Sequence, residues 1–184
     1  MLSTSVRFLF YLADNRDNQR LDDSIAWWTK WFNRGTPPVS HEEVWIPDNE
    51  FGFHYPILSL YTGQCFTSTM RGDVNGTVLR NAATVLTNPE RWVYFEVEVS
   101  TDLFKLAHIL VDDAVVNNKG YDTSAIPSFF WFWRFGSKTK DICSEVCKRF
   151  GMWCGVFNND KIESPRRQYR RFVKMGYKAQ KVGK

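Results

Sequence analysis

The sequence predicts an α+β domain in which an antiparallel sheet packs against helices. Two observations support this class. The predicted elements run in the order strand, helix, several strands, then helices, with no internal repeat. The 184 residues are 43% hydrophobic and 16% aromatic, which is enough to bury one core without a metal or disulfide framework.

Six segments have the composition of strands. The clearest are residues 92–100, where apolar and polar positions alternate, and residues 39–47, where Val39, His41, Glu43 and Trp45 are predicted to share one face. The predicted strands are 6–13, 39–47, 57–63, 64–70, 77–80 and 92–100.

Four helices are predicted. The first covers residues 22–35, and the second runs from about 101 to 117 with Leu103, Leu106, Ala107, Leu110, Val111 and Ala114 as its apolar face. Asp141 is the expected N-cap of the third, which buries Cys143, Val146, Cys147 and Phe150 at helical spacing. An aromatic loop or helix at 128–135 precedes it. The last has Ser164 as its cap and Pro165 as its first residue.

The charge is divided unevenly between the body and the C-terminal end. Residues 161–184 contain nine basic residues and one acidic residue, a net charge of +8, whereas residues 1–160 have a net charge of −4. We expect one domain whose body covers 1–160, with a basic helix and tail over 161–184 packed on the same domain. The helix should turn Tyr169, Phe172 and Val173 inward and Arg166, Arg167, Arg170 and Lys174 outward.

The basic helix allows two interpretations. It could bind an acidic partner weakly, either a nucleic acid or an acidic membrane face, or it could be a solvated helix followed by a frayed tail. Its basic residues are not interleaved with exposed aromatic residues, which favours the solvated helix.

The cysteine and hydropathy patterns indicate which cofactors, membrane segments and cellular location to expect. Cys143 and Cys147 lack zinc-knuckle spacing, so we expect no metal site and no cofactor. No apolar run approaches the roughly 18 residues that a membrane-spanning helix needs. The first 15 residues lack the pattern of a signal peptide, so the expected location is the cytoplasm.

Cys143 is the candidate nucleophile on chemical grounds. The N-terminal turn of a helix lowers the pKa of a thiol. Of the three histidines, His108 lies off the apolar stripe of its helix and His54 lies in a loop, whereas His41 stands on a strand with Glu43 two residues later. An imidazole can take a thiol proton while a carboxylate orients it. The alternative is a core thiol, a packed histidine and a solvated glutamate, which spacing alone favours.

Several segments together resemble the circularly permuted papain-like cysteine hydrolases, the NlpC-type enzymes of bacteria, phages and poxviruses. The resemblance covers about residues 5–175. It rests on Ser40-His41-x-Glu43, on Cys65-Phe66-Thr67-Ser68, on a Trp-led strand at 92 and on Tyr121-Asp122, together with Cys143-Ser144-Glu145 and the Ser164-Pro165 start of the last helix.

The resemblance implies a fold, a reaction and a set of roles. The fold would be an antiparallel sheet or partial barrel against the cysteine-bearing helix. Cys143 would be the nucleophile, His41 the base and Glu43 the orienting acid of a hydrolase that cleaves an amide, isopeptide or acyl-ester bond. Such a protein would be a phage or viral accessory protein in the host cytoplasm or the virion.

The sequence also departs from the family pattern. Residues 47–63 resemble an insertion, which makes His54 a possible alternative third member, and Ile142 stands where an aromatic residue is common. We expect Tyr121, Phe130 and Trp131 to line the substrate pocket, unless they are simply core residues. A chain with this fold could also be a non-enzymatic accessory or virion protein that binds through its surface.

Overall fold

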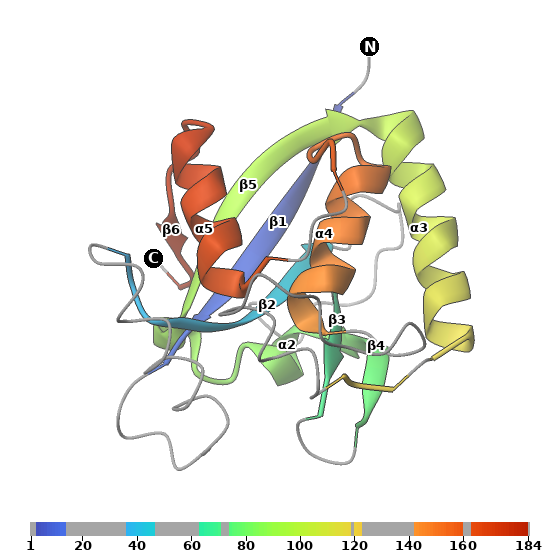
Figure 1. The fold of residues 1–184 in the computed structure, drawn as a ribbon, viewed down its shortest axis with the longest axis horizontal. Helices are drawn as coiled ribbons and strands as arrows, with labels where there is room; N and C mark the ends of the chain where they lie inside the picture. Colours follow the sequence, from blue (N-terminus) through green and yellow to red (C-terminus); the bar gives the residue numbers. More distant parts are fainter. Residues whose placement is uncertain are drawn as a thin grey trace.

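The computed structural model has a mixed α+β fold built on a six-stranded antiparallel sheet, so the predicted class and strand direction are confirmed. The strand order is β4-β3-β2-β1-β5-β6 (Figure 1). The strands are β1 Ser3–Leu12, β2 Val39–Ile46, β3 Gln64–Thr69, β4 Gly76–Asn81, β5 Trp92–Ser100 and β6 Gln180–Lys181. The structure describes residues 3–13, 36–46, 63–70, 74–118, 120–122, 142–159 and 163–183.

β1 lies at the centre of the sheet because it is apolar on both faces. It pairs with β2 on one side and β5 on the other. Phe8 and Phe10 point to one face and Leu9 to the other, and all three are fully buried. A strand buried on both faces has a continuous apolar run instead of alternation, which explains the pattern in this part of the sequence.

The two faces of the sheet carry two separate hydrophobic cores. The helix-side core includes Phe8, Phe10, Val44, Phe66, Phe95, Val146, Cys147, Phe150 and Phe172. The opposite core, here the α2-side core, comprises Leu9, Trp45, Cys65, Ala82, Val85, Leu86, Trp92 and Val182. It is named for the short helix α2, Ala82–Val85, which Asn81 caps; the 3-10 turn η2, Pro89–Arg91, leads from there into β5.

A β-bulge interrupts β2 just before His41. Tyr11 pairs with His41 but Leu12 pairs with Val39, so Ser40 is the extra residue. Val39 therefore lies in the helix-side core and not, as predicted, on the face of His41. Bulges bend a strand and re-aim its side chains.

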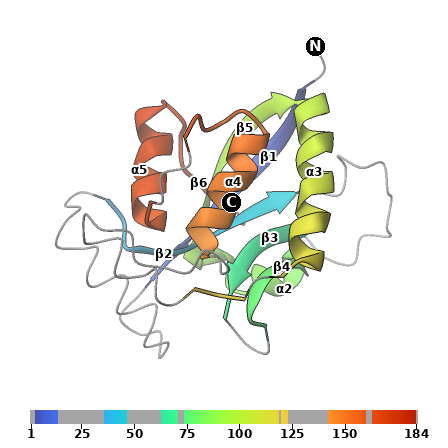
Figure 2. The same cartoon turned by 45° about the vertical axis from the view of Figure 1, so that its right-hand side comes forward.

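Three helices cover one face of the sheet: α3 Thr101–Val116, α4 Cys143–Trp153 and α5 Pro165–Lys174. Figure 2 shows them side by side in front of the strands. α3 ends within one residue of its predicted end, but its predicted apolar face is partly wrong. Phe104, Ala107 and Val111 are the buried residues, while Leu106 is 49% exposed. The helix is rotated by about one position because the ring of Phe104 fills the core.

α4 buries the four residues predicted from helical spacing, Cys143, Val146, Cys147 and Phe150. Its N-cap is Ile142, which makes no side-chain capping hydrogen bond, so the prediction of Asp141 as the cap is wrong. The helix packs against β2 and β3.

α5 begins as predicted, because the Ser164 side chain accepts a hydrogen bond from the Arg167 N–H and Pro165 is the first residue. Two residues of α5 lie on the face opposite to the one predicted for them. Arg166 is buried and its Nε donates to the Thr36 hydroxyl at 3.0 Å, whereas Val173 is 50% exposed. The chain beyond α5 is not frayed, since β6 pairs with β5 and Val182 lies in the α2-side core.

Several predicted elements lie outside the described residues: the helix at 22–35, most of the strand at 57–63 and the aromatic segment at 128–135. Across the parts of the chain that are described, no helix has the length and hydropathy needed to cross a membrane.

Candidate active site

His41 and Glu43 lie together on β2, as their spacing predicted. Every residue of β2 is buried, because the strand lies inside the sheet and both of its faces are covered. His41 Nε2 is 3.0 Å from Glu43 Oε1, so the imidazole donates a hydrogen bond to the carboxylate. With the proton on Nε2, Nδ1 is the ring nitrogen able to accept one. Trp92 meets the imidazole edge to face, with ring centroids 6.3 Å apart.

Two further side chains contact the Glu43 carboxylate. The Arg80 guanidinium of β4 donates to Oε1 as an ion pair. The Cys65 thiol of β3 also hydrogen-bonds the carboxylate; burial, and then the charge of Glu43, raise the pKa of this thiol well above its usual value. Arg80 pairs directly with Cys65 across the sheet. A cation beside a carboxylate favours its charged form, whereas burial opposes it.

Sequence reasoning did not find Arg80. A basic residue inside a short strand of otherwise apolar and small residues was the available signal. Its partner is 37 positions away and two strands across, so local spacing could not reveal the pair.

Cys143 is the first residue of α4 and is 3% exposed. It lies where the helix dipole favours a thiolate. The next residue is held from the C-terminal end of the chain, because Gln168 Nε2 of α5 donates to the Ser144 carbonyl at 2.5 Å. α5 therefore helps to fix the turn that carries the candidate nucleophile.

The imidazole and the body of α4 lie on different faces of the sheet. His41 and Glu43 share the face of Trp92 and Cys65, which belong to the α2-side core. Val146, Cys147 and Phe150 pack α4 into the helix-side core. Cys143 lies one helical turn before Cys147, at the N-terminal end of α4.

The other three cysteines have the properties of structural thiols. All are buried and free. Burial raises the pKa of Cys154 to about 12. Burial, with Glu42 as the next cause, also raises the pKa of Cys147, whose sulfur is 3.9 Å from the Phe66 carbonyl oxygen. Few thiolates form at such sites at neutral pH.

Glu42 is a second buried carboxyl group, on the helix side of β2. It is fully buried, and within the described ranges neither oxygen has a hydrogen-bond partner. Burial raises its pKa well above the usual 4.5, and Glu163 adds to the increase, while the nearby ammonium of Lys148 opposes it. Burial therefore favours the neutral form of this acid.

Tyr121 and Asp122 are buried beside the turn that opens β4. The Tyr121 N–H donates to Asn75 Oδ1 at 2.9 Å, and the Thr77 N–H donates to Asn118 Oδ1 at the same distance. We call this set of contacts the asparagine clasp. Of the other predicted site residues, His54, Phe130 and Trp131 lie outside the described residues.

Within the described ranges, no cluster of three or more His, Cys, Asp or Glu side chains could hold a metal ion. No protein-family model, curated protein or solved structure matches this chain.

Proposed function

We propose that the protein is a thiol hydrolase of the permuted papain-like, NlpC type, with Cys143 as nucleophile, His41 as base and Glu43 as the residue that orients the base. The observation that carries the proposal is the buried hydrogen bond between His41 Nε2 and Glu43 Oε1. A neutral imidazole held by a carboxylate through one nitrogen accepts a proton through the other.

The proposed reaction is acyl transfer in two steps. His41 Nδ1 takes the Cys143 proton, and the thiolate adds to the carbonyl carbon of a peptide, isopeptide or acyl ester. The leaving amine or alcohol departs with that proton, and water then hydrolyses the thioester with His41 as base. The Cys143 backbone N–H would contribute to the oxyanion hole. The resemblance suggests an accessory protein of a phage or virus.

The β-bulge at Ser40 supports this proposal. The reaction requires the Cys143 sulfur to meet the His41 ring although the body of α4 packs on the other face of the sheet. A bulge directly before His41 increases the local twist of β2. Such a twist would turn His41 from the α2 side toward the first turn of α4, which is the approach that the reaction requires.

A second candidate is a non-enzymatic accessory protein that uses this fold as a binding scaffold. The separation of the two faces favours it, because a histidine in the α2-side core and a cysteine on α4 could both be structural. The two candidates differ in one measurable property, which is whether His41 controls the reactivity of Cys143.

Iodoacetamide alkylation of Cys143, measured by mass spectrometry between pH 5 and 9, separates them. A thiolate–imidazolium pair gives fast alkylation at pH 6, and His41→Ala should slow it by about 10-fold or more. Trp45→Phe, on the same strand and face, is the matched control and should change little. An equal rate in wild type and His41→Ala would exclude the catalytic pair.

A further inference from the structure

α5 has one face buried in the domain and one basic face. Phe172 fixes its rotation, since its ring lies 4.9 Å from that of Phe8 and 5.1 Å from that of Phe95 between centroids. Tyr169 adds an edge-to-face contact with Phe10 at 5.5 Å. The side chains opposite these anchors are therefore held at the surface.

The basic face of α5 lines a pocket of about 310 Å³. Its lining residues within the described part of the chain are Arg167, Arg170, Arg171, Lys174 and Glu163, four cations and one anion with a net charge of +3. The four cations follow the helical spacing i, i+3, i+4 and i+7, so they form one stripe along the axis. We call them the basic stripe.

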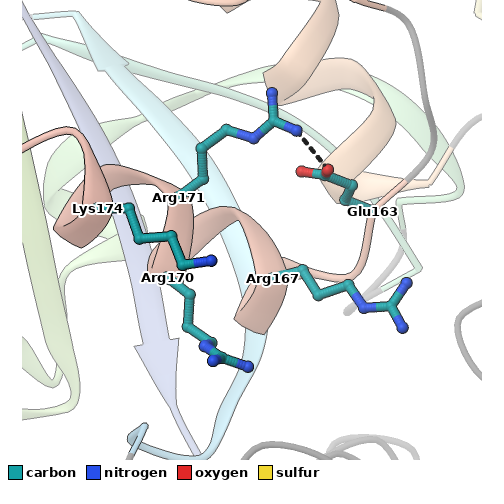
Figure 3. Close-up of a pocket in the computed structure, with 5 residues that line it drawn as sticks. All are labelled: Glu163, Arg167, Arg170, Arg171 and Lys174. Atoms are coloured by element: carbon teal, nitrogen blue, oxygen red, sulfur yellow. Dashed lines mark hydrogen bonds and ion pairs between the residues drawn. The ribbon is translucent and has the colours of Figure 1, made fainter.

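Arg171, a member of the basic stripe, is held in place. Arg171 donates to Glu163 at 2.5 Å, and its guanidinium lies 5.8 Å from the ring centroid of Phe157. Figure 3 shows Arg171 turned toward Glu163, while Arg167 and Arg170 extend away from that pair. Arg167 and Lys174 are exposed to solvent.

We propose that the basic stripe binds the sugar–phosphate backbone of a nucleic acid without reading its bases. From residue 167 to residue 174 a helix rises about 10 Å. A strand of B-DNA carries one phosphate per roughly 3.4 Å of axis, so this length matches about three phosphates. The net charge of +3 over the described lining, in which Glu163 offsets Arg171, matches that number.

The side chains of the stripe favour phosphate as the ligand. Three of the four cations are arginines, whose planar guanidinium binds phosphate oxygens in a bidentate manner. None of the described residues that line the pocket is aromatic, so they offer no platform on which bases could stack. This surface is independent of the proposed hydrolase site, and its test uses none of that site's residues.

The test is fluorescence anisotropy of the full chain with two labelled 20-base-pair duplexes of unrelated sequence, between 50 and 200 mM salt. We expect equal affinity for the two duplexes within about 2-fold. Three phosphate contacts predict a slope of about −2.7 in log K against log salt, a loss of about 40-fold over this range.

The variant Arg167→Gln/Arg170→Gln/Lys174→Gln should bind at least 10-fold more weakly at 50 mM salt, with a slope near zero. A charge-matched control replaces the exposed Lys105, Lys178 and Lys181 by Gln and should keep the wild-type slope. Circular dichroism checks that both variants fold, and the single variant Arg167→Gln, expected to reduce the slope by about 1, replaces the triple variant if that one unfolds.

Three outcomes would overturn the proposal. The first is no binding of the duplexes by wild type at 50 mM salt. The second is equal weakening in both triple variants, which would show a general effect of net charge. The third is binding to vesicles with 30% phosphatidylserine but not to duplexes, which would assign the stripe to a membrane surface.

Discussion

His41 and Glu43 stand two residues apart on β2, and their side chains bend toward each other until Nε2 and Oε1 are 3.0 Å apart. Residues at this spacing are about 7 Å apart along the backbone, so the contact depends on both rotamers. Arg80 of β4 forms an ion pair with the same carboxylate oxygen, Oε1. Glu43 therefore fixes the His41 imidazole, and Arg80 in turn fixes the Glu43 carboxylate.

If the pair is catalytic, Glu43→Gln should reduce kcat by less than about 100-fold, whereas Cys143→Ala should abolish turnover. An amide still supports the ring but stabilises an imidazolium less well, and an orienting residue contributes less than the nucleophile. Hydrolysis of a fluorogenic acyl ester would measure both. Glu98→Gln, at an exposed position of β5, is the control and should match wild type. Equal losses in Glu43→Gln and Cys143→Ala would assign Glu43 a direct chemical role.

The Glu43–Arg80 pair should show a large coupling energy. Removing one partner of a buried ion pair costs about 3–5 kcal/mol. Because 20% of the Arg80 side chain is exposed, we expect Glu43→Gln to cost about 3 kcal/mol. The double variant Glu43→Gln/Arg80→Gln should then cost clearly less than the sum of the single variants, as urea unfolding would show. Additive costs would mean that the two side chains do not stabilise each other.

Local patterns predicted those parts of the fold that local physics determines. The alternation of β5, the Ser164 cap of α5 and the buried positions of α4 follow from neighbouring residues, and each is confirmed. The side-by-side placement of His41 and Glu43 follows from strand geometry in the same way, because residues i and i+2 share a face.

Features that depend on distant residues could not be predicted in this way. The rotation of α3 is set by how well the Phe104 ring fits the sheet, while the leucines beside it have equal apolar character. β6 has two residues, too few to show an alternation of apolar and polar positions. It forms because β5 offers a free edge. The bulge at Ser40 becomes visible only through its pairing with β1.

Glu42→Gln should stabilise the protein increasingly as the pH rises above 4.5. The pKa of Glu42 is raised in the folded protein, so the folded state keeps a proton that the unfolded state loses. This contribution to stability is complete below the unfolded pKa and declines as the pH rises through the folded pKa. Glutamine cannot ionise, so the free energy of unfolding of the variant does not include this decline. Urea midpoints at pH 4, 6 and 8 would measure the difference from wild type, and parallel curves would contradict a neutral, buried Glu42.

Gly76→Ala should cost at least about 3 kcal/mol, because two penalties combine at this position. Gly76 has φ of +117°, which residues with a side chain rarely adopt, and a Cβ there would lie 1.9 Å from Asn118 Oδ1. That oxygen accepts the Thr77 N–H, so the asparagine clasp beside Tyr121 would have to open. Loss of the clasp adds the cost of unpaired backbone groups to the steric clash.

Gly176→Ala is the matched control for this substitution. Gly176 also has a positive φ, +90°, but its Cβ would meet no atom within 4 Å. We expect Gly176→Ala to cost only about 1–2 kcal/mol, the conformational penalty alone. The difference between the two variants in urea unfolding therefore measures the steric clash at Gly76 together with the loss of the clasp. Equal costs would mean that Asn118 moves aside freely, and that the clasp does not hold the Tyr121–Asp122 segment in place.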